Sequence, residues 1–295
     1  MKTGALLFPH PGRDAGLRMA ARVAEMLCGM GVLPLADAEE ETSLLPACVR
    51  RLPLGEALQN ARFAVSMGGD GAVLRAARAC AAASVPIISV NLGNTGFMAE
   101  LEPDELSLLE KAAGGVYRIE SRMMLDVSLA RPDGSSVREA VLNDVVFRGG
   151  TGVQTIALDF ALEEDPLARF SGDGAIVATP TGSTAYSLSA GGPLADPRAA
   201  CMLLTPICAH TLYLRSIVLA ADSVLTMRVM TGGDKEVYAA FDGMHVVPVA
   251  PEDVVTIRRS ALHTDLIRVK ENRFYSRVGG RLGKAAYGHI GGEGT

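Results

Sequence analysis

The residues of this 295-residue chain that are best suited to chemistry lie in a short glycine-rich loop at positions 68–71. An apolar run at 63–67 precedes the loop and a run of good helix formers at 72–79 follows it, so the pattern predicts strand, loop and helix. Glycines let the backbone approach a ligand closely, and the N–H groups that begin a helix suit phosphate. The candidate phosphate-binding residues are Gly68, Gly69 and Gly71.

An acidic residue, Asp70, lies among these candidates. A carboxylate at this place would repel phosphates if binding were the only purpose of the loop. Asp70 is therefore a candidate to accept a proton from an attacking hydroxyl or to hold a metal ion. The alternative is that Asp-Gly is only good turn chemistry, and the loop alone favours neither interpretation.

A second polar site interrupts the apolar run 140–147, where an amide and a carboxylate, Asn143 and Asp144, are adjacent. On a strand these side chains would point to opposite faces, so one of them would be buried unless a polar partner meets it. A ribose is a suitable partner. The alternative is a polar pair on an edge strand that faces water.

A third segment, 172–187, contains Asp173 and a run rich in hydroxyl groups from Thr179 to Ser187. A plain capped helix needs only one such hydroxyl. We therefore expect the run to form a helix N-terminus with capping hydroxyls and free N–H groups that bind an anion.

Composition narrows the class of protein. With 48% hydrophobic residues and a mean hydropathy of +0.23, the chain can fill two cores. We find no apolar run of about 18 residues and only a short apolar start, so we expect a soluble, cytoplasmic protein without a membrane partner. The five cysteines include no C-x-x-C pair, which favours reduced thiols. Only Cys208 is kept as a site candidate, because it follows a predicted strand near the proposed pocket.

The charge pattern and the missing motifs exclude further classes. A net charge of −5 without a long basic run argues against nucleic-acid binding. The five histidines show no metal-ligand spacing, so we expect no metal cage built by the protein. Neither a Gly-x-x-x-x-Gly-Lys-Ser/Thr loop nor a Gly-x-Gly-x-x-Gly fingerprint occurs.

The pattern of elements divides the chain into two domains. Residues 1–118 alternate strand and helix, which predicts a parallel sheet with Asp70 and the segment 91–97 at the carboxyl ends of its strands. Residues 119–272 read as short, mostly antiparallel strands. A closing helix at 273–284 is expected to pack back on the first domain, and the glycine-rich tail 285–295 should be loose.

Five sequence blocks in this order resemble the NAD kinase family, and together they span residues 4 to 283. Four are specific, and the block at 241–243 is weaker; the segment 272–276 is similar to the closing segment of the family. The four specific blocks are 68–71, 91–97, 142–145, and Asp173 followed by 179–187.

The resemblance implies transfer of a terminal phosphoryl group from ATP, or from polyphosphate, to the adenosine ribose 2′-hydroxyl of NAD, which gives NADP. It also implies a Rossmann-like N-terminal α/β domain and a β-sandwich C-terminal domain, with NAD in the cleft between them. A divalent metal, usually magnesium, would be held by the ATP phosphates, and the protein would be a homodimer or homotetramer.

Residue by residue, Asp70 matches the proposed general base of the family, and Phe97 would lie beside the adenine. Asn143 and Asp144 match the pair that binds the dinucleotide. The full set of candidate NAD-binding residues is Gly71, Phe97, Asn143, Asp144, Asp173, Thr181, Thr184, Ala185, Tyr186, Cys208 and Asp242.

Three departures from the family pattern leave alternatives open. Ala72 stands where threonine is usual, Met98 where an aromatic residue is often seen, and the residues after Gly243 differ from the expected pattern. The alternatives are a catalytically weak or silent NADP(H)-binding protein, and a lipid or sugar kinase that shares the Gly-Gly-Asp-Gly loop.

Overall fold

The computed structural model of the chain describes residues 3–40, 42–93, 96–150, 154–211, 213–230, 235–271, 274–275 and 278–279. The chain folds into two compact units. The first unit comprises Met1–Glu120 together with Asp265–Thr295, and the second comprises Ser121–Thr264. Residues 265–272, which the sequence pattern assigned to the β-rich domain, therefore belong to the first unit.

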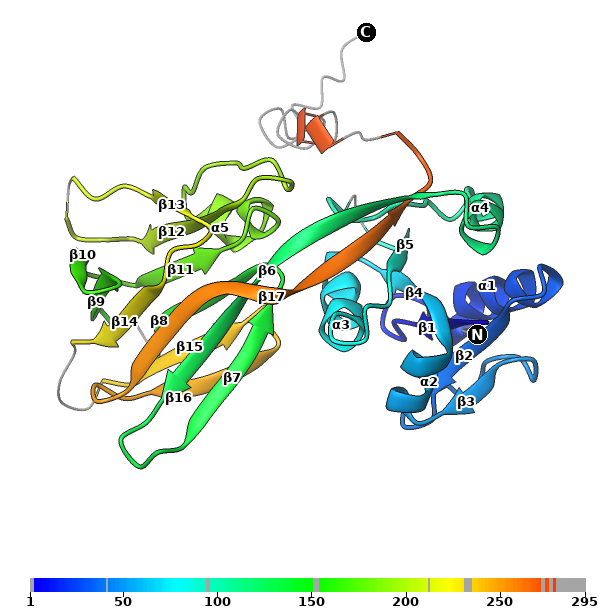
Figure 1. Ribbon diagram of the computed structural model, residues 1–295, viewed down its shortest axis with the longest axis horizontal. Coiled ribbons are helices and arrows are strands. Elements are labelled where there is room, and N and C mark those ends of the chain that lie inside the picture. The colour runs from blue at the N-terminus through cyan, green and yellow to red at the C-terminus, as the bar shows by residue number, and fades with distance from the viewer. Residues whose placement is uncertain are drawn as a thin grey trace, which may run out of the picture. The chain divides into compact units, whose positions relative to one another are not determined.

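The strands of the first unit form a parallel sheet in the order β3-β2-β1-β4-β5 (Figure 1). The end of β17 (Val254–Arg268) joins this sheet beside β5, with Leu266 opposite Ile87. The other strands are β1 (Gly4–Phe8), β2 (Leu33–Asp37), β3 (Arg50–Leu52), β4 (Ala61–Gly68) and β5 (Ile87–Asn91).

Helices follow the strands of this sheet, as expected for strand–helix alternation. The longest, α1, buries Ala20, Val23, Ala24 and Leu27 at helical spacing. The carboxylate of Asp14 caps it by accepting the N–H groups of Met19 and Ala20, each at 2.9 Å. The helices are α1 (Arg18–Gly29), α2 (Leu54–Asn60), α3 (Asp70–Cys80) and α4 (Leu109–Ala113), with 3-10 turns at Ala15–Leu17 and Leu106–Leu108.

The second unit is a sandwich of two mostly antiparallel sheets. One contains β10-β9-β14-β17, with β6 paired to β17 and to β7; the other has the order β13-β12-β11-β8-β15-β16. The strands are β6 (Arg118–Ala130), β7 (Ser136–Val141), β8 (Asp144–Gly149), β9 (Ile156–Leu162), β10 (Asp165–Gly172), β11 (Gly174–Ala178), β12 (Cys201–Ile207), β13 (Ile217–Ala220), β14 (Leu225–Val229), β15 (Val237–Phe241) and β16 (His245–Val249).

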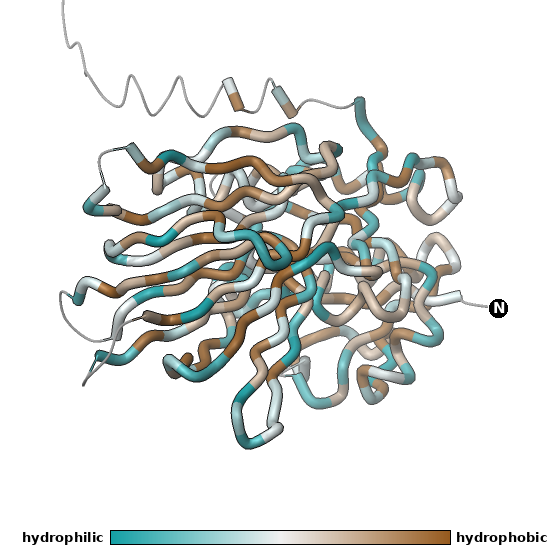
Figure 2. The backbone as a smooth tube through the Cα atoms, turned by 60° about the vertical axis from the view of Figure 1, so that its left-hand side comes forward, coloured by the Kyte–Doolittle hydropathy of each residue, from teal (hydrophilic) through white to brown (hydrophobic). Residues whose placement is uncertain are grey.

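The core of the second unit lies between these sheets. Alternate residues point inward from both, among them Phe147 of β8 and Phe160 of β9, which are fully buried. Figure 2 shows the resulting alternation of hydrophobic and hydrophilic residues along the strands. The Rossmann-like and sandwich folds expected from the resemblance are thus both present.

Several boundaries differ from the predictions. The run 140–147 is two strands, because β7 ends at Val141 and β8 begins at Asp144. Conversely, where short strands were expected throughout 119–272, residues 254–268 form one long strand, β17. The last helix of the first unit before β6 begins at Leu106 as a 3-10 turn and continues as α4.

The closing helix and tail fall largely outside the described residues. Of 273–284, only residues 274–275 and 278–279 are described, and they are helical; the tail 285–295 lies outside the described residues altogether. None of the helices that the structure describes is both long and apolar enough to cross a membrane.

Candidate functional site

The glycine-rich loop of the first unit connects β4 directly to α3. Gly68 ends the strand with a φ of +153°, and a Cβ there would lie 2.6 Å from the Cβ of Ala72, so only glycine fits. A Cβ on Gly69 or Gly71 would meet no atom within 4 Å. Packing within the protein therefore does not require these two glycines, whereas the close approach of a ligand would.

Asp70 is the first residue of α3, and its carboxylate is held by backbone amides. Oδ2 accepts the N–H of Phe97 at 3.0 Å, and Oδ1 accepts that of Met98 at 3.1 Å. Gly96 permits this approach, because a Cβ there would lie 2.5 Å from Oδ1. A carboxylate has about four acceptor sites, so two remain for a proton or a ligand.

Phe97 and Met98 have buried side chains, with 9% and 3% of their surface exposed. Their backbone N–H groups, and not their side chains, contact the candidate base. That Phe97 lies beside an adenine stays a prediction. Ala72 is also buried, at 2% exposed, so its methyl group packs inside the protein.

Asn143 lies in a bend between β7 and β8, so the prediction that it sits on a strand is wrong. Asp242 causes the bend: its Oδ1 accepts the N–H groups of Asn143 at 2.7 Å and Asp144 at 3.1 Å, and its Oδ2 accepts that of Leu142 at 2.8 Å. Three backbone donors therefore converge on one carboxylate instead of entering a ladder. Asp242 itself has a φ of +48° in the turn after β15.

The side chains of this bend are buried and poorly satisfied. Asn143 is 8% exposed, and its Oδ1 has no hydrogen-bond partner in the structure. Asp144 is 5% exposed; burial, and secondarily the negative charge of Asp242, raise its pKa to about 7. An unpaired buried amide oxygen is costly unless something binds it, so this bend is prepared for a polar ligand.

The hydroxyl-rich segment packs against the same bend. Thr179 donates its hydroxyl to the carbonyl of Leu142 at 2.6 Å and its N–H to the carbonyl of Asn143 at 2.8 Å. Gly182 lies so close that a Cβ would sit 2.2 Å from the Asn143 carbonyl oxygen. The bend and the segment therefore form one rigid substructure.

The helical part of this segment is shorter than expected, and that its N-terminus binds an anion stays a prediction. Only a 3-10 turn, Gly182–Thr184, and the four-residue helix α5 (Tyr186–Ser189) form. The hydroxyls instead bond within the unit: Ser183 donates to Pro180, Thr184 donates to Thr181, and Ser187 pairs with Thr205. Thr184, Ala185 and Tyr186 keep exposed surface beside the bend.

Asp173 and Cys208 lie at the other end of the same sheet. In the pairing of β11 with β8, Ala178 is opposite Asp144, whereas Gly174, which follows Asp173, is opposite Arg148. Cys208 follows Ile207, the partner of Gly174. At about 3.4 Å per residue, the six-residue span along β11 separates these residues from Asn143 by roughly 20 Å, so this sheet does not bring them together with the bend.

Sequence reasoning missed Arg122, which is 4% exposed and donates from Nη1 to the hydroxyl of Thr181 at 3.2 Å. A single arginine before an apolar run gives no local signal for this contact across 59 residues. In the described part of the chain, no group of three or more His, Cys, Asp or Glu residues could hold a metal.

Two family models match the chain. The ATP-NAD kinase N-terminal domain matches residues 10–113, and the ATP-NAD kinase C-terminal domain matches residues 142–269. The NAD kinase of Caldanaerobacter subterraneus subsp. tengcongensis is 38% identical over 94% of this chain and 97% of its own length. That of Symbiobacterium thermophilum is 39% identical over 84% of this chain and 90% of its own.

Two solved structures share the fold at 22% sequence identity. Yeast NADH kinase complexed with NADH has a TM-score of 0.85 over 98% of this chain and 89% of its own. An NAD kinase from Archaeoglobus fulgidus in complex with ATP has a TM-score of 0.72 over 96% of this chain and 98% of its own. The matches to both family models and the identity over nearly the whole length show that this chain belongs to the NAD kinase family.

Proposed function

We propose that this NAD kinase transfers the terminal phosphoryl group of ATP to the adenosine ribose 2′-hydroxyl of NAD, with Asp70 as the general base. Asp70 accepts the hydroxyl proton as the hydroxyl oxygen forms a bond to the terminal phosphorus. The bond from that phosphorus to its bridging oxygen breaks, and ADP leaves. The comparisons give no support to a silent NADP(H)-binding protein or to a lipid or sugar kinase.

The geometry of Asp70 is the observation that carries this assignment. Its carboxylate follows a glycine loop with open space at Gly69 and Gly71, and two backbone amides fix its orientation. A base held in this way needs no rearrangement to meet a hydroxyl. ATP as donor is supported by the Archaeoglobus fulgidus NAD kinase, which was solved with ATP; polyphosphate is the alternative donor.

For the dinucleotide, we propose that the bend at Asn143 and Asp144 binds ribose hydroxyls. Asn143 Oδ1 would accept a hydrogen bond that the protein alone does not supply. Thr184, Ala185 and Tyr186 would extend the same surface. The carboxylate of Asp242 accepts backbone N–H groups of the bend, and the hydroxyl of Thr181 accepts a hydrogen bond from Arg122. We therefore assign these two residues to positioning of the bend. NAD contacts for Asp173 and Cys208 stay predictions.

We propose magnesium as the divalent metal, held by the ATP phosphates, because magnesium keeps water and phosphate oxygens as ligands. If a protein carboxylate contributes, Asp70, Asp144 and Asp173 are the candidates. Removal of the metal with a chelator should abolish turnover, and magnesium or manganese should restore it. Tight magnesium binding to the free protein in calorimetry would contradict the assignment.

We propose that a second copy of the chain covers the outer face of the β8 sheet. Val146, Ala240 and Val246 are neighbours across three strands and point away from the core between the sheets; Val146 is buried in a second, smaller apolar cluster, and Ala240 packs against it. They line a depression of about 380 Å³, and Val246 is 55% exposed. An identical face in a two-fold dimer would cover the exposed side chain of Val246 at the edge of this cluster.

Direct measurement of NADP formation tests the proposed reaction. The purified chain is incubated with NAD or NADH, with ATP or polyphosphate, and with or without magnesium. We expect NADP from NAD and ATP only when magnesium is present. Product formed from polyphosphate but not from ATP would show that polyphosphate, and not ATP, is the phosphoryl donor. Absence of product under all conditions, despite NADP binding, would favour a catalytically silent NADP(H)-binding protein.

A further inference from the structure

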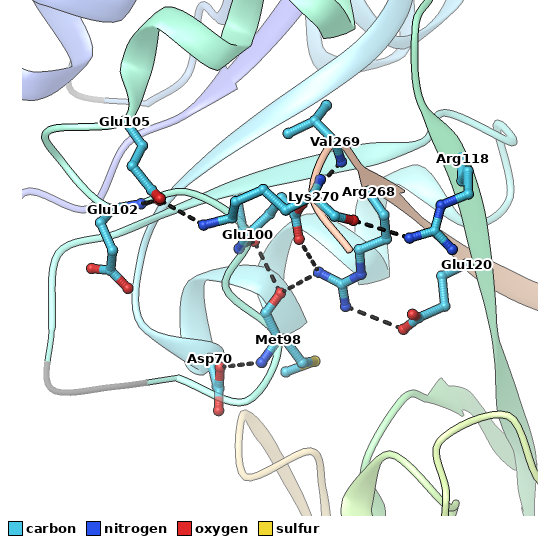
Figure 3. A network of polar contacts seen from close by, with 11 residues as sticks. Asp70, Met98, Glu100, Glu102, Glu105, Arg118, Glu120, Arg268, Val269 and Lys270 are labelled. Atoms are coloured by element: carbon cyan, nitrogen blue, oxygen red, sulfur yellow. Dashed lines mark hydrogen bonds and ion pairs between the residues drawn. The ribbon is translucent and has the colours of Figure 1, made fainter. Parts of the chain in front are cut away.

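The backbone N–H and carbonyl of Met98, which belong to consecutive peptide units, are both held by side chains (Figure 3). Its N–H donates to Asp70 Oδ1 at 3.1 Å, and its carbonyl accepts Nη1 of Arg268 and the hydroxyl of Ser89, each at 3.1 Å. All of these residues belong to the first unit. Arg268 is therefore linked to the candidate base through the backbone of a single residue, Met98.

Arg268 is buried, at 7% exposed, and its guanidinium bridges two carboxylates. Nη1 lies 3.1 Å from Oε2 of Glu100, and Nη2 lies 3.2 Å from Oε1 of Glu120. Because the guanidinium is planar with fixed donor directions, these two partners fix the direction in which Nη1 faces Met98.

Glu100 is also buried, at 3% exposed, and completes the clamp. Its Oε1 accepts the N–H groups of Val269 and Lys270, each at 2.9 Å. A buried ion pair of this kind adds little to stability compared with an apolar pair. In this protein its hydrogen bonds hold the guanidinium in one orientation. That orientation includes the hydrogen bond to the Met98 carbonyl.

We propose that Arg268 is a positioning residue for catalysis: through the Met98 carbonyl it sets the direction of the amides that hold Asp70. The inference rests on the proposed role of Asp70. Arg268 touches no reacting atom, and its effect on the reaction passes through Met98. Two further contacts complete the network without touching Met98. The ammonium group of Lys270 donates to Glu105 at 2.6 Å, and the amide of Asn91 donates to the carboxylate of Glu102.

The test is a double-mutant cycle between Arg268→Lys and Asp70→Asn. Lysine keeps the charge beside Glu100, but one ammonium cannot reproduce the guanidinium fork. Because small misplacements of catalytic groups cost up to about 100-fold, we expect Arg268→Lys to lower kcat about 10- to 100-fold, with the KM for NAD changed less than about threefold. In the Asp70→Asn background, the same change should lower kcat less than about twofold.

Two further variants keep the test decisive. Lys270→Met is the matched control, a cation of the same network that does not contact Met98, and it should leave kcat unchanged. If Arg268→Lys does not fold, the triple variant Arg268→Met, Glu100→Gln and Glu120→Gln removes the guanidinium together with both carboxylates that it bridges, and it should show the same loss of kcat and the same dependence on Asp70.

The outcomes separate the two claims. Equal losses of kcat from Arg268→Lys in both backgrounds, or a lowered melting temperature with unchanged kcat, would overturn the positioning role. High activity of Asp70→Asn alone would instead overturn the proposed role of Asp70.

Discussion

The adjacent residues Asn143 and Asp144 each destabilise the free protein, for different reasons. Asn143 has a buried carbonyl oxygen without a partner, and Asp144 is a buried carboxylate next to a second carboxylate. Neither arrangement stabilises the fold, and both are relieved by a ligand that presents hydroxyl groups. These residues are thus better explained by binding than by structure.

Replacing Asn143 by alanine should weaken NAD binding without destabilising the protein. In the free protein, the Asn143 side-chain oxygen makes no hydrogen bond that the substitution could remove. In the complex with NAD, the substitution removes one hydrogen bond, which contributes about 1–3 kcal/mol to binding. Calorimetry should show the dissociation constant raised by the corresponding factor and the melting temperature nearly unchanged. Asn60→Ala, at an exposed helix end, is the control. A lower melting temperature with wild-type affinity would make Asn143 a structural residue.

Asp144→Asn should stabilise the free protein, and more so at high pH. The folded-state pKa, about 7, lies above the unfolded value of 3.8. The unfolded chain therefore loses the proton first, and stability falls as pH rises from about 4 through about 7, by a few kcal/mol in order of magnitude. Asparagine removes this penalty, so its gain in melting temperature should be large at about pH 8 and small at about pH 4.5.

Asp159→Asn is the control for this pH dependence. A hydrogen bond from Arg169 lowers the pKa of Asp159, so its contribution is already complete above about pH 4. The melting-temperature difference of that variant should be the same at these two pH values. An equally flat difference for Asp144→Asn would show that its carboxylate is not strained.

At the scale of elements, the site depends on two turns that contact through their backbones. The bend after β7 bonds to the segment after β11 through Thr179, and Gly182 lies against the Asn143 carbonyl. Backbone atoms cannot move aside as a flexible side chain can. The position of Asn143 is therefore set by the contact between these turns.

Gly182→Ala should destabilise the protein by about 1–3 kcal/mol, because the new methyl group would overlap the Asn143 carbonyl. It should also weaken NAD binding, since the bend must shift. Denaturant unfolding measures the first effect and calorimetry the second. Gly55→Ala, in helix α2 with no atom within 4 Å of the new Cβ, should leave binding unchanged and slightly stabilise the fold. Unchanged stability of Gly182→Ala would contradict the contact.

The sequence predicted the elements whose causes are local and missed those whose causes are distant. Strand–helix alternation in the first unit follows from residues close in the chain, and so did the placement of Asp70 at the end of a strand. The break at Asn143 depends on Asp242, 99 residues away, which binds three backbone donors. The hydroxyls after Thr179 were expected at a helix N-terminus, but they satisfy backbone groups of their own unit.

At the scale of the whole molecule, the proposed chemistry is divided between the two units. The candidate base and the glycine loop belong to the first unit, and the bend that we propose binds ribose belongs to the second. Strands β6 and β17 each begin in one unit and end in the other, so the chain passes between them twice. Arg268, at the end of the second passage, belongs to the network around Asp70.

Charge on the outer face of the β8 sheet should disrupt the proposed oligomer. We expect light scattering to show a dimer or tetramer for the wild type and a smaller species for Val246→Lys, because a lysine would be buried in the interface. Val116→Lys, at a similarly exposed position in the first unit, is the control. A wild-type chain that is monomeric at all concentrations would contradict the assignment.

The central claim is that Asp70 is the proton acceptor of an NAD kinase, and the rate of NADP formation by Asp70→Asn tests it most directly. Asparagine keeps the size of the side chain and an oxygen acceptor for one backbone amide, but it cannot take a proton. Steady-state assays with NAD, ATP and magnesium should show kcat lowered by about 10²–10⁴, with NAD affinity within a few-fold of wild type. Turnover above about a tenth of the wild-type rate would remove Asp70 from this role.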